Sequence, residues 1–377
     1  MSDVSDRSKI GPRTRSVVDR STRIRALRPV LIALVVTVHI PVTLYRPDLR
    51  DVALSFGTYF SALISGCIAI AALPTLSVIS GFLAGNSAGN LTGRYAYPAY
   101  AARKFRRLIV PMLLWGLPMV VWIYTRQAGG FSVRPDLALF PFDLEQWLRA
   151  LTAYQKLPAN PPLYFLRELF LAALLLPVWR LIARSVGFSA LVAIAIFYCA
   201  VAGIHFDFFI RIDIYLYFFI GVFLAARPDV RSLDGWLCAH ARGLVLGFVL
   251  VCAALALYGL GPNPEHYWLA LNLVRLTGPV ALWALATMLA AGAVGRVLEV
   301  LSPVSFTVFL GHAIVIRVAW WAWRELFGAS RFDVAWWCFF VLAVALSFAI
   351  LGSLWWLYDR LRRRLLNTAP GQDPVAR

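Results

Sequence analysis

The sequence predicts an all-α protein, a polytopic membrane bundle of about ten transmembrane helices. Hydrophobic residues make up 60% of the 377 positions, only 15% are charged, and the mean hydropathy is +0.72. Soluble domains average about a quarter charged residues. Apolar segments long enough to cross a bilayer recur along the chain, and basic residues gather between them. Together these observations exclude an ordinary soluble domain.

The spans are predicted from the apolar segments, since a transmembrane helix needs about 20 mostly apolar residues. The second segment is long enough to be tilted or kinked, and Pro74 lies inside it. The ten predicted spans are residues 29–46, 57–84, 107–126, 163–183, 187–204, 208–226, 243–261, 267–292, 303–326 and 334–358.

The two ends of the chain are polar and basic. Residues 1–27 predict a disordered cytoplasmic tail, and no small-residue cleavage site follows the first apolar segment, so the first span is expected to be retained. Residues 28–359 predict a single ten-helix membrane domain, and residues 360–377 a basic cytoplasmic tail.

The formal net charge of +17 and the pI of about 10.2 are explained by where the basic residues lie. They fall in alternate loops, and the other loops are close to charge-balanced. This bias predicts a multi-pass protein with both termini in the cytoplasm, with the lipid bilayer and not nucleic acid as the partner of its basic surface. The largest extramembrane piece, residues 127–162, is expected to form a lid on the outer face.

The cysteines and histidines do not form a pattern typical of metal or disulfide sites. No two cysteines are spaced as CxxC, and the five histidines are scattered. We therefore expect neither a disulfide framework nor a metal centre. The cysteines are Cys67, Cys199, Cys238, Cys252 and Cys338.

Arg28 and His39 are polar residues of the first span. Eleven residues of helix bring them onto one face with a rise of about 16 Å, with Arg28 at the cytoplasmic end and Pro29 at the first helical position. Arg28 is either a topogenic charge that reaches the membrane surface or a ligand-binding cation. His39 either bonds a neighbouring helix or transfers a proton, which a neutral imidazole does well.

Two further segments lie at the predicted cytoplasmic face. Ser80 and Gly81, at the end of the second span, allow a close approach of backbone or ligand, or simply helix packing. Arg103 and Arg106 share one face where the third span begins. Guanidinium groups at a helix N-terminus favour phosphate, and the alternative is plain positive-inside charge or contact with anionic lipid.

Three weaker candidates complete the set. Arg167 and Glu168 lie at the outer entry of the fourth span, where an internal ion pair explains them as well as function does. Arg211 and Asp213 form a similar pair. His312 lies mid-span, as either a structural or a catalytic histidine.

Taken in order, these motifs resemble the acyltransferase-3 family of membrane O-acyltransferases. They are an arginine and a histidine with ten residues between them, "ISGF" closing the second span, an RxxR before a proline, "YFLRELF", and a late "FLGH". The resemblance covers residues from about 25 to 358. The residues of the "VHIP" and "YFLRELF" motifs most resemble those of members that modify exopolysaccharides or lipo-chito-oligosaccharides, including nodulation-factor fucose acetyltransferases.

The resemblance implies transfer of an acyl group, usually acetyl, from a coenzyme A thioester to a sugar hydroxyl of a surface polysaccharide or lipo-oligosaccharide. It implies a bacterial inner-membrane enzyme, with acetyl-CoA as co-substrate and no bound cofactor. Ala26 and Pro29 depart from the family's pattern of Asp and Gly, so no Asp partner is expected there. The implied roles are catalysis for His39, acyl-CoA binding for Arg28, Ser80, Arg103 and Arg106, and acceptor binding or structure for His312, Arg167, Glu168 and Tyr164.

The alternative from another functional class is a permease or flippase for a lipid-linked glycan. A transporter usually carries charges at the membrane midplane between two related halves. Here the charges gather at one face and the halves are not evidently related, which favours the enzyme.

Overall fold

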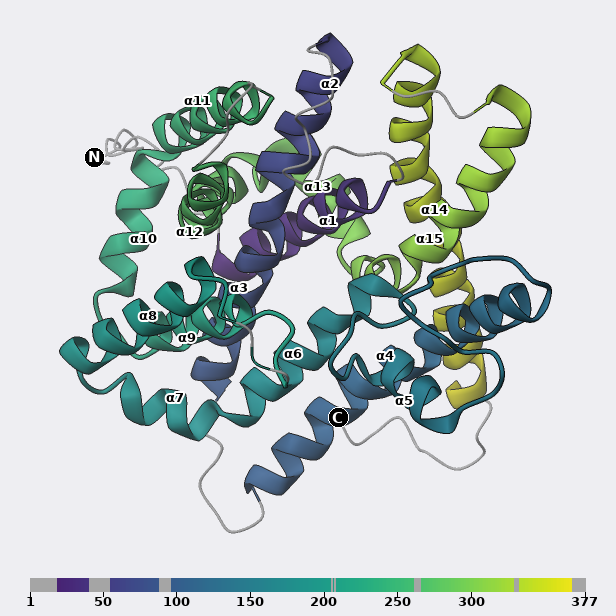
Figure 1. The fold of residues 1–377 in the computed structure, drawn as a ribbon. Helices are drawn as coiled ribbons and strands as arrows, with labels where there is room; N and C mark the ends of the chain where they lie inside the picture. Colours follow the sequence, from purple (N-terminus) through teal and green to yellow (C-terminus); the bar gives the residue numbers. More distant parts are fainter. Residues whose placement is uncertain are drawn as a thin grey trace, which may run out of the picture.

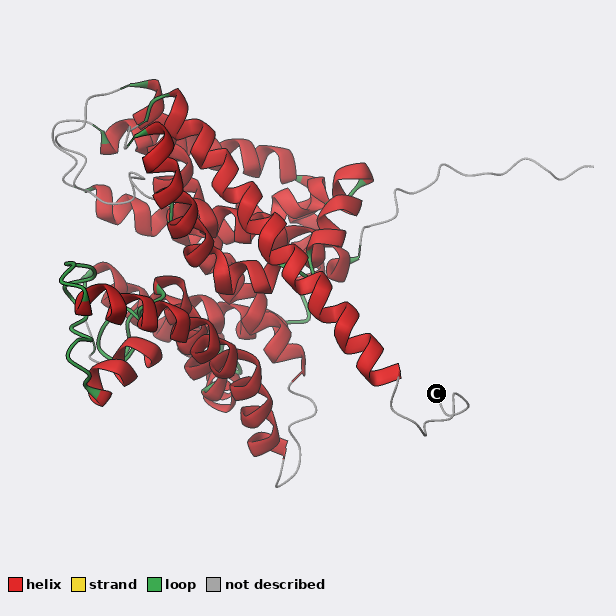
Figure 2. Ribbon diagram, turned by 90° about the vertical axis from the view of Figure 1, so that its right-hand side faces the viewer, coloured by secondary structure: helices red, strands yellow, loops and turns green. Residues whose placement is uncertain are grey.

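The computed structural model describes residues 19–40, 55–87, 96–204, 206, 208–260, 266–328 and 332–367. Within these ranges the chain consists of helices and connecting loops, and no strand forms there (Figure 2). The all-α prediction is therefore confirmed. Most of the predicted N-terminal tail and the last ten residues of the chain lie outside the described residues.

Among the described residues, six helices are long and apolar enough to cross a membrane. Two shorter apolar helices are α8 (Val186–Val201) and α9 (Asp213–Ala225). These findings establish a multi-pass membrane protein. The six long helices are Phe56–Ser87, Ala96–Ala128, Ala241–Gly259, Tyr267–Leu289, Ser305–Phe327 and Val334–Arg364.

The other four predicted spans fall on helices that are shorter, broken or rich in charge, so ten spans stay a prediction. The first corresponds to α1 (Arg20–Val38), whose first half carries four arginines. The fourth is divided at Leu175 into α6 (Tyr164–Leu174) and α7 (Leu176–Ile182). Pro177 near the start of α7 lacks the N–H that would continue the hydrogen bonding of α6.

The predicted boundary of the N-terminal tail is wrong, because α1 begins at Arg20. The Asp19 side chain caps the helix by accepting from the backbone N–H of Ser21, at 3.2 Å. Buried Ile24 and Leu27 extend the apolar face of the helix into the segment predicted to be disordered. Pro29 accordingly lies inside the helix and not at its first position. At the other end, α15 (Val334–Asn367) continues beyond residue 359.

The second long helix is irregular in its first half, as its length and Pro74 predicted. It runs through α2 (Phe56–Ser61), a π-helical segment (Ala62–Ile68), one 3₁₀ turn (Ala69–Ala71) and α3 (Ala72–Ser87). Pro74 removes the hydrogen bond to the carbonyl four residues before it, so the preceding turn is not held in α geometry. The remaining helices are α4 (Ala96–Ala128), α5 (Leu144–Thr152), α10 (Val230–Ala239), α11 (Ala241–Gly259), α12 (Tyr267–Leu289), α13 (Gly292–Leu301) and α14 (Ser305–Phe327).

Helix α1 crosses the middle of the bundle and contacts α3, α12, α13, α14 and α15 (Figure 1). Beside it, α3 and α9 pack backbone to backbone. A β-carbon on Gly81 would lie 1.9 Å from the carbonyl oxygen of Phe218, and one on Gly221 would lie 2.1 Å from that of Val78. Gly81 is therefore explained by helix packing, the simpler of its two predicted roles.

The segment between α4 and α6 folds onto the end of α4. The Gln127 amide N–H₂ donates to the carbonyls of Val133 and Leu137, at 3.0 and 2.6 Å. Its oxygen accepts from the backbone N–H groups of Leu139 and Phe140. This single side chain holds the loop closed over one end of the bundle, beside a small apolar core. The loop thus has a fixed shape that can contribute walls to a site.

Candidate active site

His39 lies at the last turn of α1, where the helix ends. Its Nδ1 is 2.8 Å from the carbonyl oxygen of Val35. A carbonyl oxygen only accepts hydrogen bonds, so Nδ1 carries the proton and donates it. The second ring nitrogen, Nε2, is then left with a lone pair. The ring is partly exposed, so this histidine is set up to accept a proton from a ligand.

His312 of α14 lies against His39. The two ring centroids are 5.1 Å apart and the rings meet edge to face. The Nδ1 of His312 faces the carbonyl oxygens of Val308 and Phe309, at 3.0 and 2.9 Å, so it too carries the proton. Its Nε2 is buried without a hydrogen-bond partner among the described residues. The structure therefore brings together two histidines that present the same nitrogen as an acceptor.

A cavity of about 740 Å³ adjoins His39, and we refer to it as the histidine pocket. Its walls come from the end of α1, the 3₁₀ turn and the start of α3, and the beginning of α6. The turn before α9, helices α12 and α14, and the loop that Gln127 closes complete them. Tyr164 lines it, and its acceptor role stays a prediction. The polar residues on its wall are His39, Arg134, Asp136, Tyr164, Arg211 and Arg275.

The arginines of the histidine pocket are held by named partners. Arg134 forms two hydrogen bonds to Asp136, at 2.8 and 2.7 Å, and these hold the pKa of that carboxyl below its usual value. Arg211 pairs with Asp213, as the sequence predicted. Arg275 donates to the Asn272 side chain at 2.9 Å. The guanidinium groups are therefore oriented before any ligand arrives.

The pair formed by Arg167 and Glu168 is buried, at 2.5 Å. Arg167 also donates to the carbonyl of Phe208 at 2.7 Å, and Glu168 accepts from the backbone N–H of Ile210. Both contacts reach the segment immediately before Arg211. The pair therefore has a positioning role toward the pocket wall, consistent with its predicted structural alternative.

The four residues assigned to acyl-CoA binding come from three helices, with Arg28 on α1, Ser80 on α3, and Arg103 and Arg106 on α4. Arg103 and Arg106 are exposed on α4, which begins well before them at Ala96. Their predicted place at a helix N-terminus is wrong, so no free backbone N–H groups support them. Arg28 instead interacts electrostatically with Arg107, the neighbouring cation.

Ser80 of α3 is half-buried. It precedes Gly81, whose backbone contacts Phe218. The next residue, Phe82, lies under the guanidinium of Arg20, 6.0 Å from the ring centroid. This segment of α3 therefore contacts both α9, through Gly81, and the charged end of α1, through Phe82.

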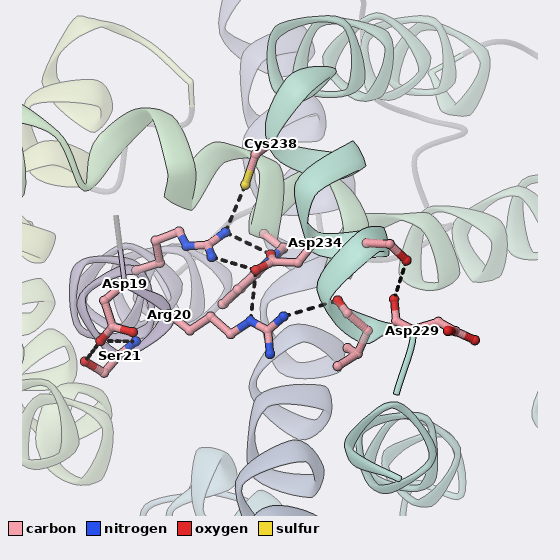
Figure 3. Close-up of polar contacts among 10 residues, drawn as sticks. Asp19, Arg20, Ser21, Asp229, Asp234 and Cys238 are labelled. Carbon is pink, nitrogen blue, oxygen red and sulfur yellow. Dashed lines mark hydrogen bonds and ion pairs between the residues drawn. The ribbon is translucent and has the colours of Figure 1, made fainter. Parts of the chain in front are cut away.

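Sequence reasoning missed a charged cluster at the first turn of α1 (Figure 3). Asp234 of α10 accepts two hydrogen bonds from Arg23, at 2.9 and 2.7 Å, and one each from Arg20 and the Trp283 indole. Burial raises the pKa of Asp234, but these hydrogen bonds outweigh it and lower the pKa to about 2. Arg23 is only 2% exposed and stacks on Trp283. The usable signal was the spacing of Arg20 and Arg23, which places both on one helix face.

No group of three or more metal-ligating side chains occurs in the part of the chain that the structure describes. The polar groups around the cavity are one imidazole, three guanidinium groups, one carboxylate and one phenol.

Comparison with known proteins agrees with these features. The model of a family described as "Acyltransferase domain" matches residues 22–356. The chain is 28% identical over 364 residues to the succinoglycan biosynthesis protein ExoH of Rhizobium meliloti (strain 1021), covering 95% of this chain and 94% of that protein. No solved structure matches. The chain is therefore a membrane protein of the acyltransferase-3 family.

Proposed function

We propose that this protein is an O-acyltransferase that moves an acyl group, most readily acetyl, from acyl-CoA to a sugar hydroxyl of a surface polysaccharide or lipo-oligosaccharide. The observation that carries the proposal is His39, whose Nδ1–H is engaged by the Val35 carbonyl while its ring lines a cavity of about 740 Å³. Membership of the acyltransferase family supports the reaction class. The relative named for succinoglycan biosynthesis supports an exopolysaccharide as acceptor.

The reaction follows from the chemistry of a neutral imidazole. His39 Nε2 takes the proton of the sugar hydroxyl as its oxygen attacks the thioester carbonyl. The new C–O bond forms, the C–S bond breaks, and the coenzyme A thiolate takes the proton from the imidazolium. His312, 5.1 Å away between ring centroids, adds a second neutral imidazole beside the reacting groups. In this scheme no charge is left on the protein at the end of a turnover.

The donor would approach from the Arg28 end of α1. Arg28 and Arg107 provide neighbouring cations for its phosphates, with Arg103 and Arg106 on the exposed face of α4 and Ser80 on α3. The acyl-pantetheine arm would then extend toward His39, over a helix rise of about 16 Å. With the topology predicted from loop charges, the donor would bind on the cytoplasmic side and the acceptor pocket would face the outer side.

The experiment compares a deletion strain complemented with wild type, His39→Ala, Arg28→Ala and His266→Ala. His266 is an exposed histidine outside the pocket and serves as the matched control. Ester-linked acyl groups on extracted surface polysaccharide and glycolipid are read by mass spectrometry, and membrane levels of each variant are measured. We expect His39→Ala to lose transfer by a factor of about 10² to 10⁴, the usual contribution of general acid–base catalysis.

Wild type and His266→Ala should restore the mass of one acyl group per modified sugar. Arg28→Ala should raise the KM for acyl-CoA more than it lowers kcat. Normal acylation by His39→Ala at normal protein level would contradict the mechanism. A change in glycan export without any change in acylation would contradict the enzymatic function altogether.

A further inference from the structure

The histidine pocket has an excess of positive charge. Its wall carries three arginines and one aspartate among the described residues, and Asp213 behind Arg211 adds a second carboxylate. Two more cations adjoin this group. Lys156 donates to the backbone carbonyl of Asp136 at 3.1 Å, and Arg317 of α14 interacts electrostatically with Arg134.

The three arginines come from three separate parts of the fold. Arg134 belongs to the loop closed by Gln127, Arg211 to the turn before α9, and Arg275 to α12. Arg275 is 5% exposed, stacks on Trp268 at 4.8 Å, and interacts electrostatically with Asp213. Burying a guanidinium in a membrane protein is costly, which applies to Arg275, whereas Arg134 and Arg211 are partly exposed. Convergence of these three cations on one cavity favours an anionic ligand.

These arginines lie on the His39 end of α1, not on the Arg28 end. Arg28, Arg103 and Arg106 are absent from the wall of the histidine pocket. The cations proposed for the coenzyme A phosphates and the cations of the pocket are therefore two separate groups. The phosphates of a coenzyme A donor bound at the Arg28 end therefore do not account for the arginines of the pocket.

We propose that Arg134, Arg211 and Arg275 form an oxyanion site for a carboxylate or phosphate carried by the sugar acceptor, which makes this enzyme selective for acidic glycans. The inference rests on the proposed function, because it names the class of acceptor for that reaction. Guanidinium groups bind both oxyanions through paired N–H donors. The anion holds the acceptor so that a hydroxyl of the same or a neighbouring sugar reaches His39.

The test is equilibrium binding to the full-length protein in lipid nanodiscs, which does not require turnover. The probes are glucuronate, glucose 1-phosphate, neutral glucose, and coenzyme A. The variants are wild type, His39→Ala, Arg275→Gln, Arg275→Lys and Arg134→Gln. Arg25→Gln is the control, because Arg25 is an exposed cation at the opposite end of α1.

We expect at least one anionic sugar to bind wild type about tenfold or more tightly than glucose. Arg275→Gln and Arg134→Gln should each raise the Kd of that anionic sugar about tenfold and leave the Kd of coenzyme A unchanged, while Arg275→Lys retains part of the binding. Arg134 lies in a loop, so its variant keeps the test valid if Arg275→Gln does not fold. Which probe binds distinguishes a sugar carboxylate from a sugar phosphate.

Equal affinity for glucose and both anionic sugars would overturn the proposal. So would a loss of coenzyme A binding in the Arg275 and Arg134 variants, because the cluster would then belong to the donor. His39→Ala should retain the selectivity for anionic sugars. If wild type binds them selectively but transfers no acyl group, the proposed function fails while the oxyanion site stands.

Discussion

The two ends of helix α1 carry charge in opposite ways. At the first turn, Arg20 and Arg23 converge on the single carboxylate of Asp234, with Trp283 completing its hydrogen bonds. These groups contact one another directly. At the last turn, His39 borders an open cavity whose wall carries arginines from three other parts of the fold.

This contrast separates structural from functional charge in a membrane bundle. A charge with all its partners on neighbouring helices stabilises the packing of those helices. Charges that line a cavity remain available to a ligand as well as to their protein partners. Substitutions that disturb one end of α1 at a time test this distinction.

The greatest loss of stability is expected at Asp234. Asp234→Ala leaves Arg23 buried without its carboxylate, and breaking such a pair costs about 3 to 5 kcal/mol. Thermal unfolding of the purified protein in detergent measures the loss. Asp234→Asn, which keeps the size and one acceptor oxygen, is the matched variant and should lose less. Unchanged stability of Asp234→Ala would show that the cluster does not hold α1 in place.

The same residue predicts a pH dependence. The folded pKa of Asp234 is lowered to about 2, below the value of about 3.9 for an unfolded chain. Its stabilising contribution is therefore fully present above about pH 4 and is lost as pH falls toward about 2. Unfolding midpoints measured across this range should fall more steeply for wild type than for Asp234→Asn. Parallel curves would contradict the assignment.

At the other end of α1, the next effect is on activity. His312→Gln removes the imidazole beside His39 while keeping a polar side chain, and we expect acyl transfer to fall about 10²-fold, equivalent to about 2.7 kcal/mol. The pH–rate profile should change as well, which a purely structural role would not cause. A normal rate with an unchanged profile would assign His312 to structure alone.

A smaller effect is expected at the seam between α3 and α9. Gly81→Ala would place a β-carbon 1.9 Å from the Phe218 carbonyl, so the helices must shift apart at a cost of about 1 to 3 kcal/mol. Gly247→Ala on α11 is the control, because nothing lies within 4 Å of that position. A loss of acyl-CoA binding without loss of stability in Gly81→Ala would favour the ligand role of this segment instead.

Among these substitutions, Arg25→Gln should cause the smallest change in stability. The ion pair of Arg25 with Glu299 is 3.6 Å long, with exposed fractions of 51% and 35% for the two side chains. Exposed pairs contribute about 0 to 1 kcal/mol. Arg25→Gln should therefore unfold within about that margin of wild type in the same thermal assay. A loss as large as that of Asp234→Ala would mean that exposure does not separate the two ion pairs.

Part of the candidate site was predictable from single residues. An arginine and a histidine inside apolar helices are costly, so Arg28, His39 and His312 were recognisable as candidates in the sequence. The pairing of Arg211 with Asp213, and of Arg167 with Glu168, followed from short spacing along the chain. Each of these inferences needs only local sequence, because it concerns one helix at a time.

The remaining features depend on contacts between distant segments. The start of α1 was misplaced because the sequence shows Arg23 only as one of several basic residues near the N-terminus. Its partners, Asp234 of α10 and Trp283 of α12, are distant along the chain. The fourth predicted span was drawn as one helix, but it is divided near Pro177 into α6 and α7. No local pattern indicates that Arg134 and Arg275 reach one cavity.

The order of residues is enough to establish an all-α membrane protein with a candidate histidine inside its first predicted span. Hydrophobicity and the cost of buried charge depend on local sequence, so spans and unusual polar residues can be predicted from it. Only the folded bundle shows that His312 meets His39 and that arginines from a loop, a turn and α12 surround one pocket. Such contacts depend on how helices cross, which is set by packing across the whole bundle.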